Sequence, residues 1–197
     1  VEEMYDAAYK TGSKNYWQRL RESAQLGLDR ILPDDSRRHE LLLYKGLSSL
    51  HLEDANVSET YDENGNAMFP GENDIKAVLE DDPGNVLAWA TLAHGRMAIY
   101  YRMLNEGRTQ QAARNKLFAD ETMEQAVAAA GDSFEVNMTY LREMLLRQNV
   151  LRQEYLSDPE SVTGEELEVA NVTVLDSQEN LVGAFQLERH ESRVSEI

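Results

Sequence analysis

Apolar residues recur three and four positions apart through most of the chain, which is the spacing that places them on one face of an α-helix. In one segment Trp89, Leu92, Ile99 and Met103 follow this spacing, and Arg96 interrupts it. Proline and glycine are scarce, while Ala, Leu, Glu, Gln, Met and Arg are plentiful, which favours helices over sheets. The pattern therefore predicts an all-α protein.

Four similar boundaries divide these amphipathic stretches. Each closes an apolar stretch and then offers Asp, Ser or Asn, whose side chains can cap the free backbone N–H groups at a helix start. The boundaries are "ILPDDS" ending at Ser36, "LEDDPGN" ending at Asn85, "AAAGDS" ending at Ser133 and "TVLDSQ" ending at Gln178. Their separation of roughly 45 to 50 residues predicts a helical repeat array.

The stretches on either side of the boundaries predict antiparallel helical hairpins stacked in series within a single domain, residues 1–197. The expected hairpins lie at 1–33, 36–82, 85–130 and 133–175, followed by a C-terminal helix at 178–194. The β-branched cluster "VANVTVL" (169–175) is predicted as helix, and 54–73 as an inserted loop. "FPGEND" is predicted to start the next helix, with Asn73 or Asp74 as its cap.

Residues 74–101 resemble the junction between two tetratricopeptide repeats. Trp89 opens a helix after the turn, and Leu92 and Ala93 follow where the family has Leu-Gly. The family's Tyr is Arg96 here, which departs from the pattern. The resemblance implies a short tetratricopeptide-like solenoid, although the period exceeds the family's roughly 34 residues. Other helical-hairpin solenoids, with periods of roughly 40 to 47 residues, are the alternative.

The resemblance also implies a function. In that family the first helices of the hairpins line a concave groove that binds a protein or peptide. It implies a non-enzymatic scaffold for protein–protein interactions, with candidate partner-binding residues Ala90, His94 and Met97; Arg96 could face the same ligand. The simpler interpretation of His94 is an ordinary, partly exposed helix residue. The alternative function is a periplasmic or lipoprotein component of a solute-uptake or envelope assembly.

Charge narrows the expected partner. The chain holds 36 acidic and 19 basic residues, a net charge of −17, so it would repel the phosphates of a nucleic acid. The simpler interpretation is a highly soluble surface, and the more specific one is a basic partner protein. No apolar run approaches the roughly 18 residues of a membrane span. The chain lacks cysteine and starts at Val1, which fits a cytoplasmic or a processed periplasmic protein.

The segment 61–74, "YDENGNAMFPGEND", begins like a calcium-binding loop. Oxygen-bearing side chains alternate at Asp62, Asn64 and Asn66. The sixth position, which requires Gly, is Ala67, and the twelfth, which requires a bidentate Glu, is Asn73. We therefore predict a structural loop that does not bind calcium, with a turn at "ENGN", because Asn-Gly suits a positive φ.

No other chemistry is clustered along the chain. The histidines lack helical ligand spacing, and they are His39, His51, His94 and His190. Hydrolase elbows, phosphate loops and dinucleotide fingerprints are absent. We therefore predict no enzymatic activity and no cofactor. Trp89 is predicted to be buried between helices, and core filling is predicted for Met97, Met103, Met123, Met138 and Met144.

Overall fold

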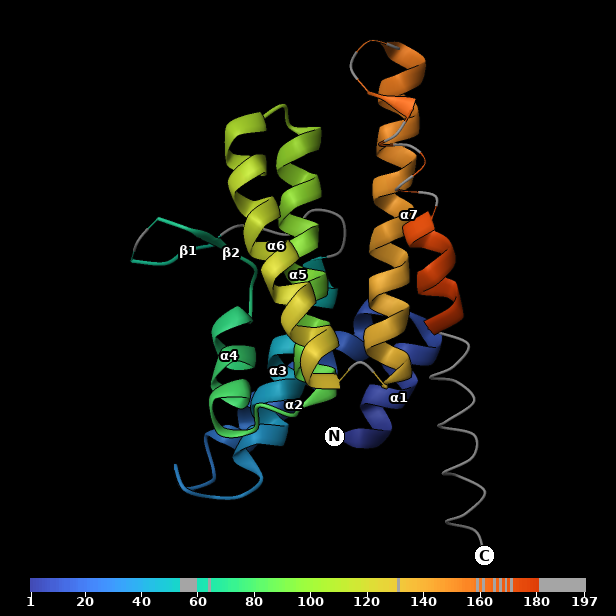
Figure 1. Ribbon diagram of the computed structural model, residues 1–197. Helices are drawn as coiled ribbons and strands as arrows, with labels where there is room; N and C mark the ends of the chain where they lie inside the picture. Colours follow the sequence, from blue (N-terminus) through green and yellow to red (C-terminus); the bar gives the residue numbers. More distant parts are fainter. Residues whose placement is uncertain are drawn as a thin grey trace, which may run out of the picture. The chain divides into compact units, whose positions relative to one another are not determined.

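The computed structural model describes residues 1–53, 60–63, 65–130, 132–158, 160, 162–164, 166, 168, 170 and 172–180. Most of them are helical, which confirms the prediction of an all-α protein (Figure 1). The helices are α1 (Glu2–Thr11), α2 (Lys14–Leu28), α3 (Arg38–Glu53), α4 (Glu72–Asp81), α5 (Val86–Asn105), α6 (Thr109–Ala130) and α7 (Phe134–Ser157). The described residues between 164 and 180 are also helical, and β1 (Thr60–Tyr61) and β2 (Ala67–Met68) form a small hairpin.

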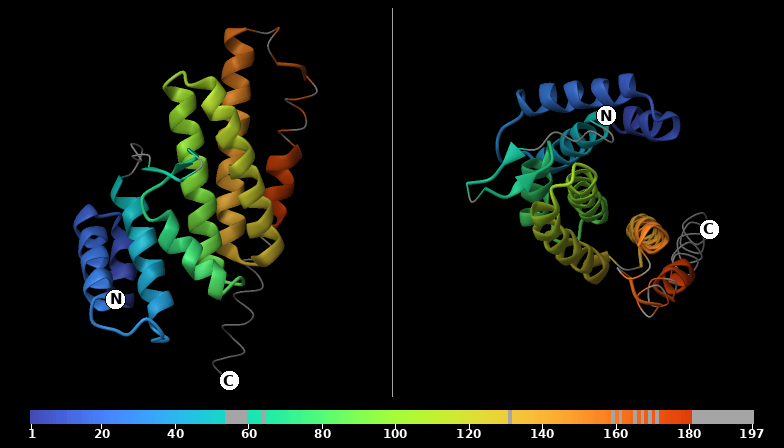
Figure 2. Two further views of the ribbon diagram at one scale, coloured as in Figure 1. Left: turned by 90° about the vertical axis from the view of Figure 1, so that its left-hand side faces the viewer. Right: turned by 90° about the horizontal axis from the view of Figure 1, so that it is seen from above.

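The chain forms two compact units, Val1–Gln125 and Ala126–Ile197, whereas we predicted one domain. In the first unit the helices pack in the order of the chain, from α1 on α2 through to α4 on α5. α3 also contacts α5, and α5 and α6 lie side by side as an antiparallel pair (Figure 2). This serial packing is what hairpins stacked in sequence produce.

The helices of the first unit differ in how many of their sides are buried. α3 and α5 are buried around almost their whole circumference, including nearly every residue from 41 to 50 in α3. α2, α4 and α6 each bury a single stripe at spacings of three and four, such as Trp17, Leu20 and Ala24 in α2. A helix that is buried on all sides lies in the centre of a layer. α3 and α5 are therefore central, and α2, α4 and α6 cover them.

Glycines allow two close approaches within this core. A Cβ atom on Gly46 of α3 would lie 2.9 Å from the Gly71 carbonyl oxygen, so the loop before α4 passes directly over α3. A Cβ atom on Gly95 of α5 would lie 2.4 Å from the ring of Phe69. Phe69 is itself buried in the main core cluster. The segment that enters α4 is thus packed against both central helices.

Two of the predicted helix caps are confirmed by their hydrogen bonds. Asn85 caps α5, because its Oδ1 accepts a hydrogen bond of 3.0 Å from the Ala88 N–H. Ser133 precedes α7, and its Oγ accepts a bond of 3.4 Å from the Val136 N–H. A short polar side chain before a helix thus satisfied free N–H groups where the sequence predicted it.

Two other predicted boundaries are wrong. The helix continues from 172 to 180 across "TVLDSQ", and Ser177 Oγ donates to the Thr173 carbonyl oxygen inside it, 2.6 Å away. Serine bonds back to the preceding turn as readily as it caps, so its identity alone did not locate an end. α4 begins at Glu72 with Gly71 before it, so Asn73 and Asp74 lie within the helix. Beyond residue 180, the predicted helix 178–194 lies outside the described residues.

Trp89 is half-buried, so the prediction that it is buried between helices is wrong. Its ring packs against the main core cluster, but its indole N–H donates to the Pro83 carbonyl oxygen at 2.8 Å. A tryptophan N–H needs such a partner, and the α4–α5 turn at the surface provides it. Four of the five methionines predicted to fill the core are buried, and the exception is Met138.

The second unit contains α7 and the helical residues that follow, which run antiparallel beside it (Figure 1). Leu141 and Met144 of α7 pack against Val174, within the stretch predicted as helix. This second helix starts with a capping box, because Thr163 Oγ1 accepts from the Glu166 N–H at 3.2 Å and Glu166 Oε2 accepts from the Thr163 N–H at 2.7 Å. The Thr163 backbone and hydroxyl bonds lower the pKa of Glu166.

Candidate functional site

The segment that resembled a calcium loop is a β-hairpin closed by its own side chains. Tyr61 pairs with Ala67 across the two strands, and Gly65 takes a φ of 73° in the turn, which confirms the predicted turn. Asp62 Oδ1 accepts from the Asn66 N–H, and Oδ2 accepts from the Asn66 side-chain amide, both at 2.7 Å. Both carboxylate oxygens therefore serve the turn. Within the described part of the chain, no three or more His, Cys, Asp or Glu side chains are grouped to hold a metal ion.

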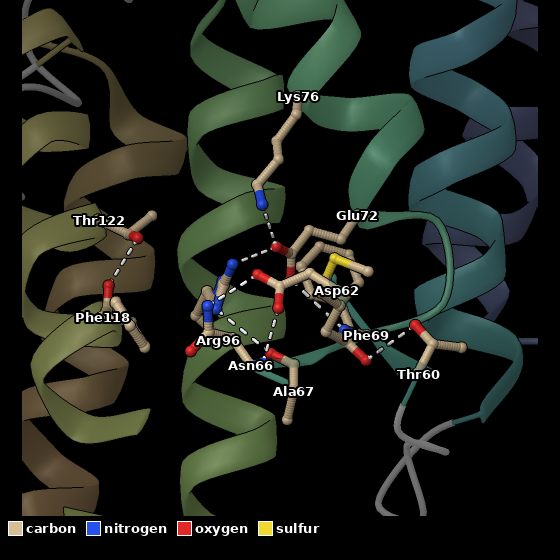
Figure 3. A network of polar contacts seen from close by, with 11 residues as sticks. Thr60, Asp62, Asn66, Ala67, Phe69, Glu72, Lys76, Arg96, Phe118 and Thr122 are labelled. Carbon is tan, nitrogen blue, oxygen red and sulfur yellow. Dashed lines mark hydrogen bonds and ion pairs between the residues drawn. The ribbon is translucent and has the colours of Figure 1, made fainter. Parts of the chain in front are cut away.

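A buried ion pair joins α4 to α5, and its arginine also holds the hairpin. Arg96 is 8% exposed, and its guanidinium contacts the Glu72 carboxylate, whose side chain is fully buried (Figure 3). Arg96 Nη1 also donates to the Ala67 carbonyl oxygen at 3.3 Å. Lys76 Nζ lies 2.7 Å from Glu72 Oε1, and the Phe69 N–H donates to Glu72 Oε2 at 3.4 Å. Every oxygen of the buried carboxylate thus has a partner.

Arg96 also contacts α6, because its guanidinium lies 5.6 Å from the ring centre of Phe118, a cation–π geometry. One side chain therefore connects β2, α4, α5 and α6. The sequence offered Arg96 as a residue that could face a ligand, and the burial of the guanidinium contradicts that. At the position where the resembled family has Tyr, this chain uses a charged group to hold the hairpin in place.

A second polar group on α5 lies two residues earlier. His94 is half-buried, and its ring stacks on His51 of α3, with ring centres 6.1 Å apart and planes 21° apart. His51 stacks more closely on Trp17 of α2, at 4.3 Å and 10°. The three near-parallel rings join α2, α3 and α5.

Further ring contacts, edge-on or tilted, lead toward α1. Tyr5 lies 6.3 Å from Trp17, 5.3 Å from Tyr44 and 5.9 Å from Tyr9, measured between ring centres. The full set, which we call the ring array, is Tyr5, Tyr9, Trp17, Tyr44, His51 and His94. All but Trp17 belong to α1, α3 and α5, the first helices of the three hairpins of this unit. Exposure rises along the array from the buried Trp17 to Tyr9, which is 66% exposed.

The structure separates the three residues predicted to bind a partner. Ala90 and Met97 are buried, which contradicts a place in a groove, whereas His94 keeps exposed surface. The sequence missed the other members of the ring array. The only local signal was the pair Tyr5 and Tyr9, four residues apart on one helix face. Contacts between rings on different helices leave no mark in the spacing along the chain.

A shallow depression between α2 and α3 has a volume of about 490 Å³. Its lining residues are Arg21, Glu22, Gln25, Leu26, Asp29, Lys45 and Ser49. Lys45 is already paired with Asp74, at 3.0 Å. The lining mixes both signs of charge and points to no class of ligand. The ring array is therefore the stronger candidate for a functional site.

Comparison with protein-family models, with curated proteins and with solved structures gives no match to this chain. Among the described helices, none combines the length and the hydropathy needed to cross a bilayer.

Proposed function

We propose that this protein is a non-enzymatic scaffold of tetratricopeptide-like type that binds a partner protein or peptide along the first helices of its hairpins. The observation that carries the proposal is the ring array, a partly exposed row of aromatic and imidazole rings on α1, α3 and α5. Serial packing of the helices supports it, because an array of this kind offers an extended surface.

The ring array has the properties of a pre-organised binding surface. Its rings are held by contacts with one another, so little conformational freedom is lost when a partner covers them. Tyr, Trp and His combine apolar faces with polar edges. Such side chains suit a surface that is exposed to water in the free protein and buried when a partner binds. The net charge of −17 favours a partner with a basic surface.

A photo-crosslinking experiment tests the proposal. A photoreactive phenylalanine analogue is placed at Tyr9 or, as the matched control, at Leu117 of α6, which is similarly exposed at 64%. We expect one protein to be captured from position 9 and not from position 117. The purified partner should bind the wild-type chain, and the His51→Ala/His94→Ala variant should weaken that binding by about tenfold, as expected for hot-spot residues. Equal capture from both positions, or unchanged affinity of the double variant, would contradict the proposal.

A further inference from the structure

Three tyrosines form one end of the ring array. Tyr5 lies between Tyr9 and Tyr44, at 5.9 Å and 5.3 Å between ring centres. Tyr5 and Tyr9 come from one face of α1, and Tyr44 comes from α3. Tyr9 is largely exposed and Tyr5 is half-buried, so part of this cluster reaches the surface. We call these three residues the tyrosine cluster.

Carboxylates surround the tyrosine cluster. Glu2 and Asp6 lie on the same face of α1 as the two tyrosines, and Glu40 precedes Tyr44 by one turn of α3. All three acidic residues are exposed. Burial, followed by the charges of Glu40, Glu2 and Asp6, raises the pKa of Tyr44. The negative charges of both helices therefore converge on one phenol.

Tyr44 is only 9% exposed, and its ring contacts that of Tyr5. Lys10 Nζ is 3.9 Å from Asp6 Oδ2, and both side chains are exposed. Such a surface pair is weak and can be displaced.

We propose that the tyrosine cluster and its carboxylates bind the cationic side chain of a lysine or arginine on the partner protein. The inference rests on the proposed function, since it supplies the chemistry of the contact that the scaffold makes. Aromatic faces attract an alkylammonium or guanidinium group, and nearby carboxylates add to that attraction. The same carboxylates repel an anion, and a purely apolar side chain would leave them unused.

Small probes test the site without any knowledge of the partner. N-acetyl-lysine methylamide is titrated into the full chain at constant ionic strength, and the ring signals of Tyr5, Tyr9 and Tyr44 are followed by NMR. N-acetyl-norleucine methylamide, which has the same stem without the charge, is the matched probe. We expect saturable shifts with lysine and none with norleucine. Equal shifts with both probes, or no saturation with lysine, would overturn the proposal.

Variants then assign the binding to the carboxylates. Glu2→Gln/Glu40→Gln should weaken lysine binding by about tenfold and Tyr9→Leu by about threefold, given the usual strength of such contacts. Glu121→Gln/Glu124→Gln removes the same charge from exposed positions of α6. This control variant should change the affinity for the lysine probe less than twofold. An equal loss of lysine affinity in both double variants would mean that the probe responds only to the net charge of the protein, and would refute a specific site. All substituted side chains are exposed, so circular dichroism should confirm unchanged folding.

The partner captured by photo-crosslinking separates this inference from the proposed function. If that partner binds wild-type chain but is insensitive to Glu2→Gln/Glu40→Gln, the scaffold stands and the cation site is wrong. If the lysine probe binds and no partner is captured at position 9, the proposed function fails, and with it the assignment of the cation to a partner. If the partner loses about tenfold in affinity with the same double variant, both are supported.

Discussion

His94 and Arg96 lie two residues apart on α5, and they differ in how deeply their side chains are buried. Arg96 points into the protein, where it contacts Glu72, the Ala67 carbonyl and the Phe118 ring. His94 is half-buried and ends a row of contacting rings that leads to the exposed Tyr9. The sequence offered both as residues that could face a ligand. The difference is that the Arg96 guanidinium is enclosed by its partners, whereas the His94 side chain keeps exposed surface.

The comparison assigns two kinds of role. A charge without water must be paired, so removing one member of a buried pair leaves the other uncompensated. Arg96 is thus a determinant of stability. Removing a neighbour of a half-buried imidazole costs little free energy of unfolding. Substitutions in the ring array can therefore change the affinity for a partner without a change in fold. The following predictions test this division, from the largest expected effect to the smallest.

Arg96→Met should destabilise the protein by about 3–5 kcal/mol, because it leaves the Glu72 carboxylate buried without its main partner. The measurement is urea denaturation followed by circular dichroism. Lys76→Met is the control, since Lys76 contacts the same carboxylate but is 41% exposed, and it should cost less than about 1 kcal/mol. Equal costs for the two variants would show that Arg96 is not a buried structural group, and the comparison with His94 would lose its basis.

Gly95→Ala should cost about 1–3 kcal/mol, because the new methyl group would lie 2.4 Å from the ring of Phe69. This position lies between the two residues compared and tests whether the hairpin segment is seated on α5. The Phe69→Leu background provides the control. There the added methyl group should cost less, which would appear as a coupling energy in a double-mutant cycle. Strict additivity would mean that Phe69 and Gly95 do not constrain each other.

His94→Ala should change the free energy of unfolding by less than about 1 kcal/mol, since the side chain is half-buried and its stacking contact is at 6.1 Å. The same urea measurement applies. A cost as large as that of Arg96→Met would place His94 in the structural group and remove the reason to expect a separate binding role.

The exposed ion pair between Asp35 and Arg37 should affect titration and little else. Two bonds from Arg37, at 2.9 and 2.7 Å, lower the pKa of Asp35 from its usual 3.8 to about 2. Because the folded-state pKa is lowered, any stabilisation by this pair is present above the usual pKa and is lost as the pH falls through 2. An NMR titration should give a midpoint of about 2, which should rise toward 3.8 in Arg37→Gln. An unchanged midpoint would contradict the pairing.

Local chemistry made much of the fold predictable from the sequence. Apolar spacing is a property of a single helix, and it located the helices that the structure describes. The Asn85 cap and the turn at Gly65 depend only on neighbouring backbone groups, and both were predicted. The two-residue strands were not predicted, because such short segments carry no periodic signal.

The candidate site could not be predicted from the sequence, because it depends on which helix faces pack against each other. Ala90 and Met97 lie on α5 at positions that a tetratricopeptide-like groove would use, but α5 is buried on almost every side here. Arg96 was expected to be accessible, and it lies inside because α4 brings the buried Glu72 carboxylate and β2 brings the Ala67 carbonyl oxygen to it.

The sequence by itself determined the helices, the caps at Asn85 and Ser133 and the net negative charge, because propensity, capping and charge act over a few neighbouring residues or over the whole composition. Only the tertiary structure decided that residues 5, 17, 44, 51 and 94 bring their rings together. The widest of those contacts along the chain joins His51 and His94, and the geometry of all of them follows from the packing of α1, α2, α3 and α5. Packing angles and close approaches between helices arise from the summed fit of many side chains, which spacing along one chain does not encode.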